Sequence, residues 1–319
     1  MNCISTVLSA PCHLGGLMKK LKSKSTGDRI YAFMLTVPAF LLALVFILIP
    51  IADSVIKSFL QYGVKNIISG KPGVWNNFAN YIKLFASSQI TNAIINTFSF
   101  VLFVILFQFI LGMALALVLN SNIVGSRFFR SVMMTPWVVP TVISALIWMW
   151  LFQPQYGLVK YLVSFLSGGA ITDFAMLNQP DTALLGVSIA ALWKQIPLMT
   201  LLLLAGLQNV PDSIHEAATI DGAGPVRRFF SITLPYMSTV IKIAISMSII
   251  ENFKQFPLFW TMTGGGPDGA TTNLAILSYR EAFVSNNLGS GAAVTTIWML
   301  LMIITVGLYN KLFRTYDMS

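Results

Sequence analysis

The stretch that decides the fold of this chain runs from residue 215 to residue 235 and reads His215-Glu-Ala-Ala-Thr-Ile-Asp221-Gly222-Ala-Gly-Pro225-Val-Arg227-Arg228-Phe-Phe-Ser-Ile-Thr-Leu-Pro235. Pro211-Asp212-Ser213 offers capping oxygens and a helix-compatible proline, so we expect a short helix over 214–220. Gly222 predicts its end, because glycine enters the left-handed conformation without a Cβ penalty. Pro225 suits the first turn of a second short helix. The stretch therefore predicts a helix, a sharp turn and a helix.

The composition predicts the environment of this chain. Of its 319 residues, 56% are hydrophobic and only 10% are charged, with a mean hydropathy of +0.76. Such a chain has too little polar surface to coat a soluble globule. Apolar windows of about 20 residues are long enough to cross a bilayer, and they occur at 31–51, 93–119, 132–152, 183–207, 238–260 and 292–313. We therefore expect an all-α polytopic membrane protein with six spans and both termini on the same side.

The basic residues predict which side that is, because they are enriched in cytoplasmic loops. One face carries eleven of them: Lys19, Lys20, Lys22, Lys24, Arg29, Arg127, Arg130, Arg227, Arg228, Lys311 and Arg314. The opposite loops carry six: Lys57, Lys65, Lys71, Lys83, Lys160 and Arg280. Both termini and the 209–237 loop are therefore expected in the cytoplasm. The net charge of +9 needs no nucleic-acid partner, since the cationic excess faces anionic lipid headgroups.

The first residues do not fit a cleaved signal. Residues 1–17 have no basic n-region, and Pro11-Cys12-His13 breaks their apolar run, so neither a secretory signal nor a lipoprotein box fits. Met18-Lys19-Lys20 is a plausible true start. Cys3 and Cys12 both fall in this segment, so no disulfide framework is expected in the spans.

Two segments resemble catalytic motifs, but each lacks a residue that its motif requires. His215-Glu216 begins a zinc-protease motif, but Thr219 stands where the second histidine is needed. Gly264-Gly265-Gly266-Pro267 is not followed by the lysine of a phosphate-binding P-loop. We therefore expect no catalytic residue, no metal site and no cofactor in this chain.

Two segments resemble a known family. Glu216-Ala217-Ala218, then Asp221-Gly222-Ala223, Phe229 and Leu234-Pro235 resemble the cytoplasmic EAA loop of binding-protein-dependent ABC importer permeases. In that family the loop plugs into an ATPase subunit. The resemblance implies that the coupling surface comprises Glu216, Ala217, Ala218, Asp221, Gly222, Arg227 and Arg228. The alternative is an ordinary amphipathic connector.

The second segment runs from Phe259 to Phe283 and contains the glycine run 264–266 and Pro267. It is similar to the outer loop after the fifth core helix in carbohydrate-importer permeases of the maltose and glycerol-phosphate type. Glycines and a proline end a helix, and Trp260 is a natural anchor at the outer interface. The alternative is a merely flexible loop.

The resemblance implies a six-helix type I importer domain over 31–313, with tails at 1–30 and 314–319, in the bacterial cytoplasmic (inner) membrane. It implies a heterodimer with a second permease, two ATPase subunits that bind ATP and Mg, and an extracytoplasmic solute-binding protein. The cargo would be a sugar or oligosaccharide, moved by alternating access. The alternative is a secondary transporter or channel with ion coupling, which the EAA pattern and the lack of an evident inverted repeat disfavour.

Polar residues inside two predicted spans suggest the substrate path. They stand before Pro197 and before Pro257, and comprise Trp193, Lys194, Gln195, Glu251, Asn252, Lys254 and Gln255. Charged groups are costly in lipid unless they face a partner or a wet cavity, so we expect them to point inward. Glu251 has two candidate partners, Lys254 and Lys194. If it pairs with Lys254, Lys194 is uncompensated and would attract an acidic sugar such as a uronate oligosaccharide. Pairing of Lys194 with Glu251, or with the second permease, would remove that attraction.

Other residues shape the spans. Asn96 and Gln108 are expected to bridge helices. Pro136 and Pro140 predict a bent helix. The outer segments 54–91 and 153–182 predict short interfacial helices.

Overall fold

A computed structural model describes residues 26–121, 125–171 and 173–313. Over these ranges the chain is almost wholly helical, and its strands are a two-residue antiparallel pair, β1 (Leu60–Gln61) and β2 (Val74–Trp75). The all-α class predicted from composition is confirmed. The chain divides into two units, Met1–Ser54 and Val55–Ser319. The predictions for residues 1–17, for Cys3 and Cys12 and for the tail 314–319 concern residues outside the described ranges.

The first unit is an apolar helical rod. It consists of α2 (Thr26–Ala43), the π-helical turn η1 (Leu44–Leu48) and most of α3 (Ile49–Ser58), which continues across the boundary. The segment Phe33–Ser58 has a mean hydropathy of 2.7, and no residue of its most apolar window is buried. A surface of this kind is stable in lipid or against another apolar surface.

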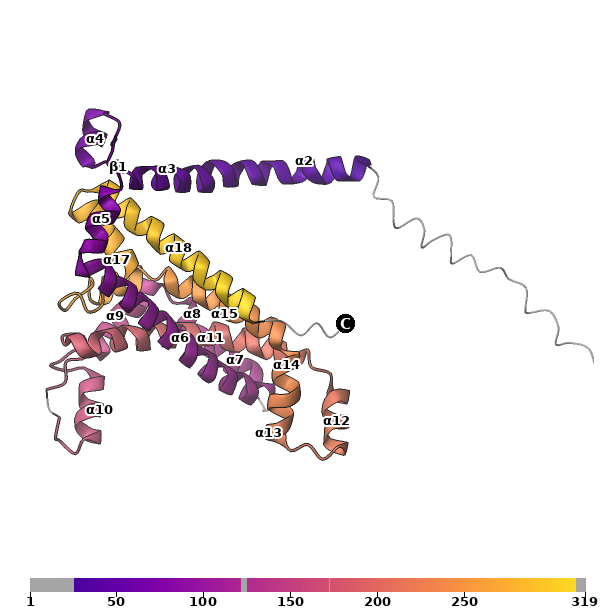
Figure 1. Ribbon diagram of the computed structural model, residues 1–319. Coiled ribbons are helices and arrows are strands. Elements are labelled where there is room, and N and C mark those ends of the chain that lie inside the picture. The colour runs from indigo at the N-terminus through magenta and orange to yellow at the C-terminus, as the bar shows by residue number, and fades with distance from the viewer. Residues whose placement is uncertain (1–25, 122–124, 172, 314–319) are drawn as a thin grey trace, which may run out of the picture. The chain divides into compact units, whose positions relative to one another are not determined.

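The second unit is built around four helices, α6 (Ser88–Asn120), α11 (Pro180–Gln208), α15 (Ser238–Phe253) and α18 (Leu288–Leu312). The most extensive contact runs between α6 and α11, which cross closely (Figure 1). Gly112 permits the approach, because a Cβ there would lie 2.8 Å from Met199 Cγ. Small residues at helix crossings are the usual means of close packing in membranes. Phe100, Phe253 and Phe259 fill the core between these helices.

Two further spans are broken. α7 (Ser126–Met133) with α8 (Thr135–Val138) meets α9 (Thr141–Leu151) at 93°. Pro140 lies at the break, as predicted, because it has no N–H to continue the helix. The segment Pro225–Tyr236 meets α15 at 71°. In the described ranges, four unbroken helices and two bent pairs account for up to six spans, which agrees with the six predicted.

The predicted span 238–260 needs a correction. α15 ends at Phe253, and a separate helix, α16 (Pro257–Met262), begins with Pro257 in its first turn. Proline disfavours helical geometry in the residue before it and cannot donate to the preceding turn. Pro257 therefore starts a new helix instead of kinking a continuous one.

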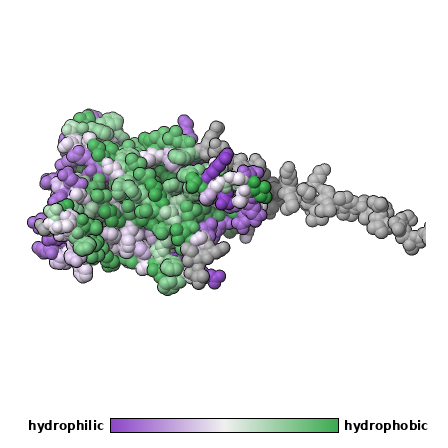
Figure 2. All heavy atoms as spheres, turned by 90° about the horizontal axis from the view of Figure 1, so that it is seen from below, coloured by the Kyte–Doolittle hydropathy of each residue, from purple (hydrophilic) through white to green (hydrophobic). Residues whose placement is uncertain are grey.

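Short helices connect the long ones. The short helices predicted within 54–91 and 153–182 are confirmed as α4 (Val64–Ser69), α5 (Ala79–Ala86) and α10 (Leu158–Leu166), and their place at the outer interface stays a prediction. The remaining elements are α12 (Asp212–Ile220), α13 (Pro225–Arg228), η2 (Phe229–Thr233), α14 (Leu234–Tyr236), α17 (Leu274–Tyr279) and η3 (Arg280–Val284). Apolar side chains cover most of the surface shown in Figure 2, and polar ones gather toward its sides. The exposed apolar residues include Leu102, Leu106 and Ile110 of α6, as expected of a helix that faces lipid.

Asn273 fixes the chain after the break at Lys254. Its Nδ2 donates to Gln255 O at 2.8 Å, and its Oδ1 accepts from Ile276 N at 2.9 Å as the N-cap of α17. The side chain is only 3% exposed. Because both partners are backbone groups of different segments, this one amide ties the end of α15 to the start of α17.

Asn273→Ala is expected to destabilise the protein by about 2–4 kcal/mol, because it removes a cap and leaves buried backbone groups without partners. Thermal unfolding in detergent measures the effect. Asn287→Ala is the matched control, since Asn287 caps α18 through Ser290 N but is exposed. Equal losses in the two variants would contradict the role assigned to Asn273.

Candidate functional site

The polar stretch 215–235 folds as predicted into two short helices, α12 and α13, which Figure 1 shows projecting beside α14. The capping prediction was wrong. Pro211 is the N-cap of α12 and makes no side-chain cap, and Asp212 is already helical. Proline has no oxygen in its side chain, so Asp212 instead places its negative charge in the first turn, where the helix dipole favours it.

Gly222 makes the turn between the two helices. Its φ is +77°, and no atom lies within 4 Å of an added Cβ. Ala223 N donates to Ala218 O at 2.9 Å and Gly222 N to Thr219 O at 3.1 Å. This is the Schellman arrangement that ends helices with a left-handed residue. The position therefore requires glycine for its backbone conformation and not for lack of space.

A side-chain bond holds α12 and α13 together. Arg228 Nη1 donates to Thr219 Oγ1 at 2.7 Å, and Thr219 Oγ1 donates to His215 O at 2.7 Å. Among the predicted coupling residues, Glu216, Ala217, Asp221, Gly222 and Arg227 are exposed, Arg228 is half-buried, and Ala218 is buried. The loop thus presents a surface with Glu216 and Arg227 on it, while Ala218 and Arg228 support it from within.

Sequence reasoning missed two apolar residues at the tip of this loop. Ile220 is 86% exposed and Val226 is 70% exposed. They flank the glycine turn, and large aliphatic side chains beside a turn are the signal that could have marked them. Exposed apolar side chains on a polar loop are typical of a contact surface.

The α12–α13 loop continues directly into the long helix α15. η2 and α14 follow α13 directly and lead to the bend at Met237, where α15 begins. Met237 is buried, and a Cβ on Gly206 of α11 would lie 2.9 Å from Met237 Cε. The bend between α14 and α15 is therefore packed tightly against α11.

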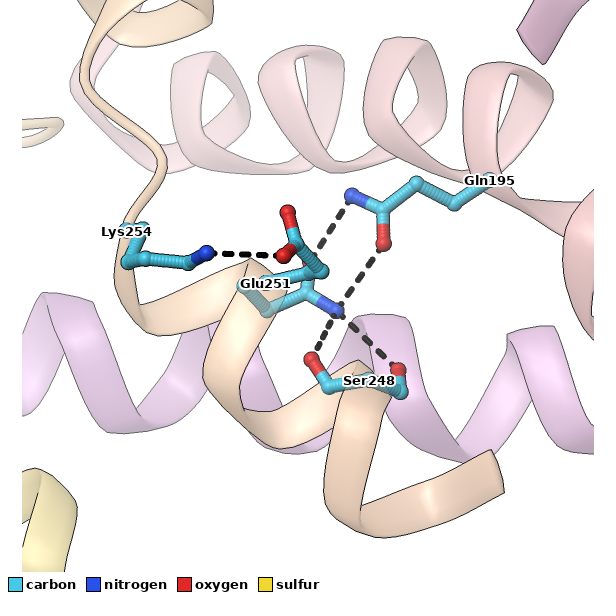
Figure 3. A network of polar contacts seen from close by, with 5 residues as sticks. Gln195, Ser248, Glu251 and Lys254 are labelled. Atoms are coloured by element: carbon cyan, nitrogen blue, oxygen red, sulfur yellow. Dashed lines mark hydrogen bonds and ion pairs between the residues drawn. The ribbon is translucent and has the colours of Figure 1, made fainter. Parts of the chain in front are cut away.

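The second constellation is a chain of amides and hydroxyls between α6, α11 and α15. Gln195 Nε2 donates to Asn252 Oδ1 at 3.0 Å, and Asn252 Nδ2 donates to Gln195 Oε1 at 3.1 Å. Asn252 Nδ2 also donates to Ser248 O at 2.9 Å. Ser248 Oγ donates to Gln108 Oε1 at 2.8 Å, and Gln108 Nε2 donates to Gln195 O at 3.3 Å. Figure 3 shows Gln195 facing the helix that carries Ser248.

The predicted helix-bridging role of Gln108 is thereby confirmed. Asn96 bridges α6 to a loop instead of to a helix, because its Nδ2 donates to Gly269 O at 3.1 Å and Thr272 O at 3.0 Å.

Glu251 pairs with Lys254. Lys254 Nζ lies 2.7 Å from Glu251 Oε1 (Figure 3), and about half of each side chain is exposed. This is the first of the two predicted pairings. The alternative pairing of Glu251 with Lys194 is not formed.

Lys194 takes other partners. Its Nζ donates to Val139 O and, at 3.3 Å, to Trp137 O. These carbonyls end α8, where the break before Pro140 leaves them without helical donors. Over the described ranges no carboxylate lies within ion-pair distance of Lys194. The lysine thus donates to backbone acceptors, and no acidic side chain of the described residues forms an ion pair with it.

A cavity of about 360 Å³ lies over these groups. Four of the seven predicted substrate-path residues line it, namely Lys194, Gln195, Glu251 and Gln255. Gln108, Trp137 and Ser248 line it as well. Asn252 is 1% exposed and does not line the cavity, but it holds Gln195 in place through their hydrogen bonds. Lys254 stands outside the lining, and Trp193 packs against Trp148 of α9 at 6.1 Å between ring centroids. Trp137 is therefore the aromatic side chain of this cavity.

Comparison with known proteins decides the family. Residues 108–316 match the model of the binding-protein-dependent transport system inner membrane component. The chain belongs to this family. It is thus a multi-pass inner-membrane component of an ABC importer, a transporter subunit and not an enzyme, as the EAA resemblance implied.

Individual relatives agree along nearly the whole chain. The trehalose/maltose transport system permease protein MalF of Thermococcus litoralis is 33% identical over 93% of this chain and 97% of that protein. The sulfoquinovosyl glycerol transport system permease protein SmoG of Agrobacterium fabrum is 33% identical over 91% of this chain and 92% of that protein.

A solved structure matches the fold. The crystal structure of a bacterial ABC transporter involved in the import of the acidic polysaccharide alginate contains a chain that aligns with a TM-score of 0.76 at 20% identity. The alignment covers 95% of this chain and 99% of that one. At this identity the likeness concerns the fold alone, and it confirms the predicted type I importer architecture.

Proposed function

We propose that this chain is the membrane-spanning subunit of an ATP-driven importer for a sugar or oligosaccharide. The proposal rests on the cavity between α11 and α15, whose lining includes several polar side chains. These two helices flank the α12–α13 loop. The cargo class draws support from the relatives, whose names mention trehalose, maltose and sulfoquinovosyl glycerol. An extracytoplasmic binding protein would deliver the cargo.

The cavity has the chemistry that sugar hydroxyls require. Gln195, Gln255 and Gln108 carry amides that both donate and accept, and Ser248 adds a hydroxyl. Trp137 supplies an aromatic face. Sites for small polar ligands combine apolar or aromatic walls with a few convergent polar groups. A second permease subunit would close the open side of this cavity as a heterodimer.

The coupling follows from the connection between loop and cavity. One of the two ATPase subunits, which bind ATP and Mg, would receive the surface formed by Glu216, Ala217, Asp221, Gly222 and Arg227. Their closure would displace α12 and α13, and the packed joint at Met237 would pass the displacement to α15. Because α15 carries Ser248 and Glu251 on the cavity wall, its movement opens the cavity alternately to each side.

The function is tested by ATP hydrolysis in the complex of this chain with its second permease, its ATPases and its binding protein. The rate is measured with maltose, trehalose, trigalacturonate, methionine and dialanine. We expect at least one of the three carbohydrates to stimulate hydrolysis, and neither methionine nor dialanine to do so. Stimulation by methionine or dialanine alone would overturn the carbohydrate assignment.

The orientation of the chain is also a proposal, with α12–α13 and both termini in the cytoplasm. Lys71 and Arg227 are both exposed and stand on opposite predicted faces. We expect a membrane-impermeant maleimide to label Lys71→Cys from outside and Arg227→Cys only from inside, in a variant without Cys3 and Cys12. Labelling of position 71 from the cytoplasmic side alone would reverse the topology.

A further inference from the structure

Four aromatic side chains of the second unit contact one another, with Phe256, Trp260 and Tyr279 in mutual contact and Phe283 against Tyr279. We call Phe256, Trp260, Tyr279 and Phe283 the aromatic row. Ring centroids are 5.7 Å apart for Phe256 and Trp260, 4.7 Å for Trp260 and Tyr279, and 5.2 Å for Tyr279 and Phe283. The membrane cavity uses none of these rings.

The backbone around the row is firmly held. Phe256 and Trp260 stand on or just before α16, whereas Tyr279 and Phe283 stand on α17 and η3, after the glycine loop. Arg280 Nη2 donates to Gly264 O at 2.7 Å across that loop. A Cβ on Gly265, whose φ is +94°, would lie 2.7 Å from Thr272 Oγ1. The loop is therefore tightly packed and fixes the spacing of the rings, which corrects the view of a merely flexible segment.

Two of the four rings are exposed, and polar side chains share a cavity with one of them. Trp260 is 39% exposed and Phe283 is 65% exposed. A cavity of about 550 Å³ contains Trp260 together with Gln89, Asn92, Asp268 and Glu281 in its lining. Carboxylates and amides beside an indole are costly to bury against an apolar helix or lipid. They suit a ligand with hydroxyl groups around an apolar face.

One member of the row, Trp260, belongs to the lining of the outer cavity. Another member, Phe256, lines neither cavity but directly follows Gln255 in the chain, and Gln255 lines the membrane cavity. The row is thus part of the outer cavity and is adjacent in sequence to the membrane cavity.

We propose that the aromatic row is a second carbohydrate site, which receives sugar rings at the outer cavity. This inference rests on the carbohydrate function proposed above. The C–H groups of a pyranose face carry partial positive charge, and an aromatic face carries partial negative charge, so the two attract. Gln89, Asn92 and Asp268 bind hydroxyl groups at the ring edge. Because stacking does not depend on the pattern of hydroxyls, the row suits several saccharides.

The test is uptake of radiolabelled maltose, trehalose and trigalacturonate by proteoliposomes that contain the complete importer. Trp260→Leu keeps an apolar side chain but removes the aromatic face, and Trp260→Phe keeps that face. We expect Trp260→Leu to lower the initial rate at limiting sugar by about threefold to tenfold. Trp260→Phe is expected to stay within about twofold of the parent. Tyr279→Leu is expected to behave like Trp260→Leu.

The matched control is Trp150→Leu, because Trp150 is an exposed tryptophan of α9 outside both cavities. It is expected to leave uptake unchanged. Parent rates in both Trp260→Leu and Tyr279→Leu would overturn the aromatic row while leaving the importer function intact. Loss of the second permease from the purified complex in Trp260→Leu would also overturn it, by making the row a subunit contact. If the parent takes up none of the three sugars, the proposed function fails and the row fails with it.

Discussion

Gly222→Val is expected to lower ATP-driven uptake by the complete importer roughly 5-fold to 100-fold, while the membrane helices stay folded. Gly222 holds φ at +77° between α12 and α13. A β-branched residue is strained in this conformation by about 1–3 kcal/mol. The strain acts on the turn alone, since no atom lies within 4 Å of the added Cβ. The coupling surface is therefore displaced without disturbing the core.

Two variants sharpen this prediction. Gly224→Val is the matched control, because Gly224 has φ of −66° and also has open space around its Cβ position. Its expected loss is below about threefold, since valine replaces glycine only as the N-cap of α13. Gly222→Asn is expected to retain most activity, because asparagine tolerates the left-handed region. Full transport by Gly222→Val would contradict the coupling assignment.

Lys194→Gln is expected to lower the stimulation of ATP hydrolysis by trigalacturonate roughly 10-fold to 100-fold at limiting sugar, since hydrogen bonds to charged groups contribute about 1.5–3 kcal/mol. Lys194 lines the cavity, and no carboxylate of the described residues pairs with it, because Glu251 pairs with Lys254. We therefore propose that Lys194 attracts an acidic carbohydrate, although Glu251 lines the same cavity. Glutamine keeps an N–H donor on the side of the carbonyls of Trp137 and Val139, although its side chain is one bond shorter than that of lysine.

The control for this charge prediction is Lys242→Gln, which removes a half-buried lysine of α15 outside the cavity. It is expected to leave the trigalacturonate response unchanged. An unchanged response in Lys194→Gln, or stimulation of the parent by maltose and trehalose only, would contradict an acidic cargo.

The α12–α13 loop was predictable from the backbone preferences of single residues. The turn at Gly222 and the helix start at Pro225 depend on backbone preferences of single residues, and the structure repeats both. The bend before α9 follows from Pro140 in the same way. The six spans were predictable because length and hydropathy alone define them.

The partners inside the membrane were not predictable to the same degree. Lys194 binds carbonyls that become free only when α8 and α9 break, so its partners depend on a bend in another helix. Trp193 was expected in the substrate path, yet its ring packs on that of Trp148. The aromatic residue that lines the cavity is Trp137. α11 is apolar on nearly every side, so no hydrophobic periodicity marks which face points to the cavity.

The energy source of uptake distinguishes an ATP-driven importer from a transporter coupled to an ion gradient. Proteoliposomes with the complete importer and its binding protein are given the carbohydrate that stimulates hydrolysis, and are energised either by ATP on the side of the ATPase subunits or by a sodium or proton gradient. We expect accumulation only with ATP and with the binding protein, and uptake roughly 5-fold to 100-fold slower in Gly222→Val. Accumulation driven by an ion gradient without ATP would contradict it.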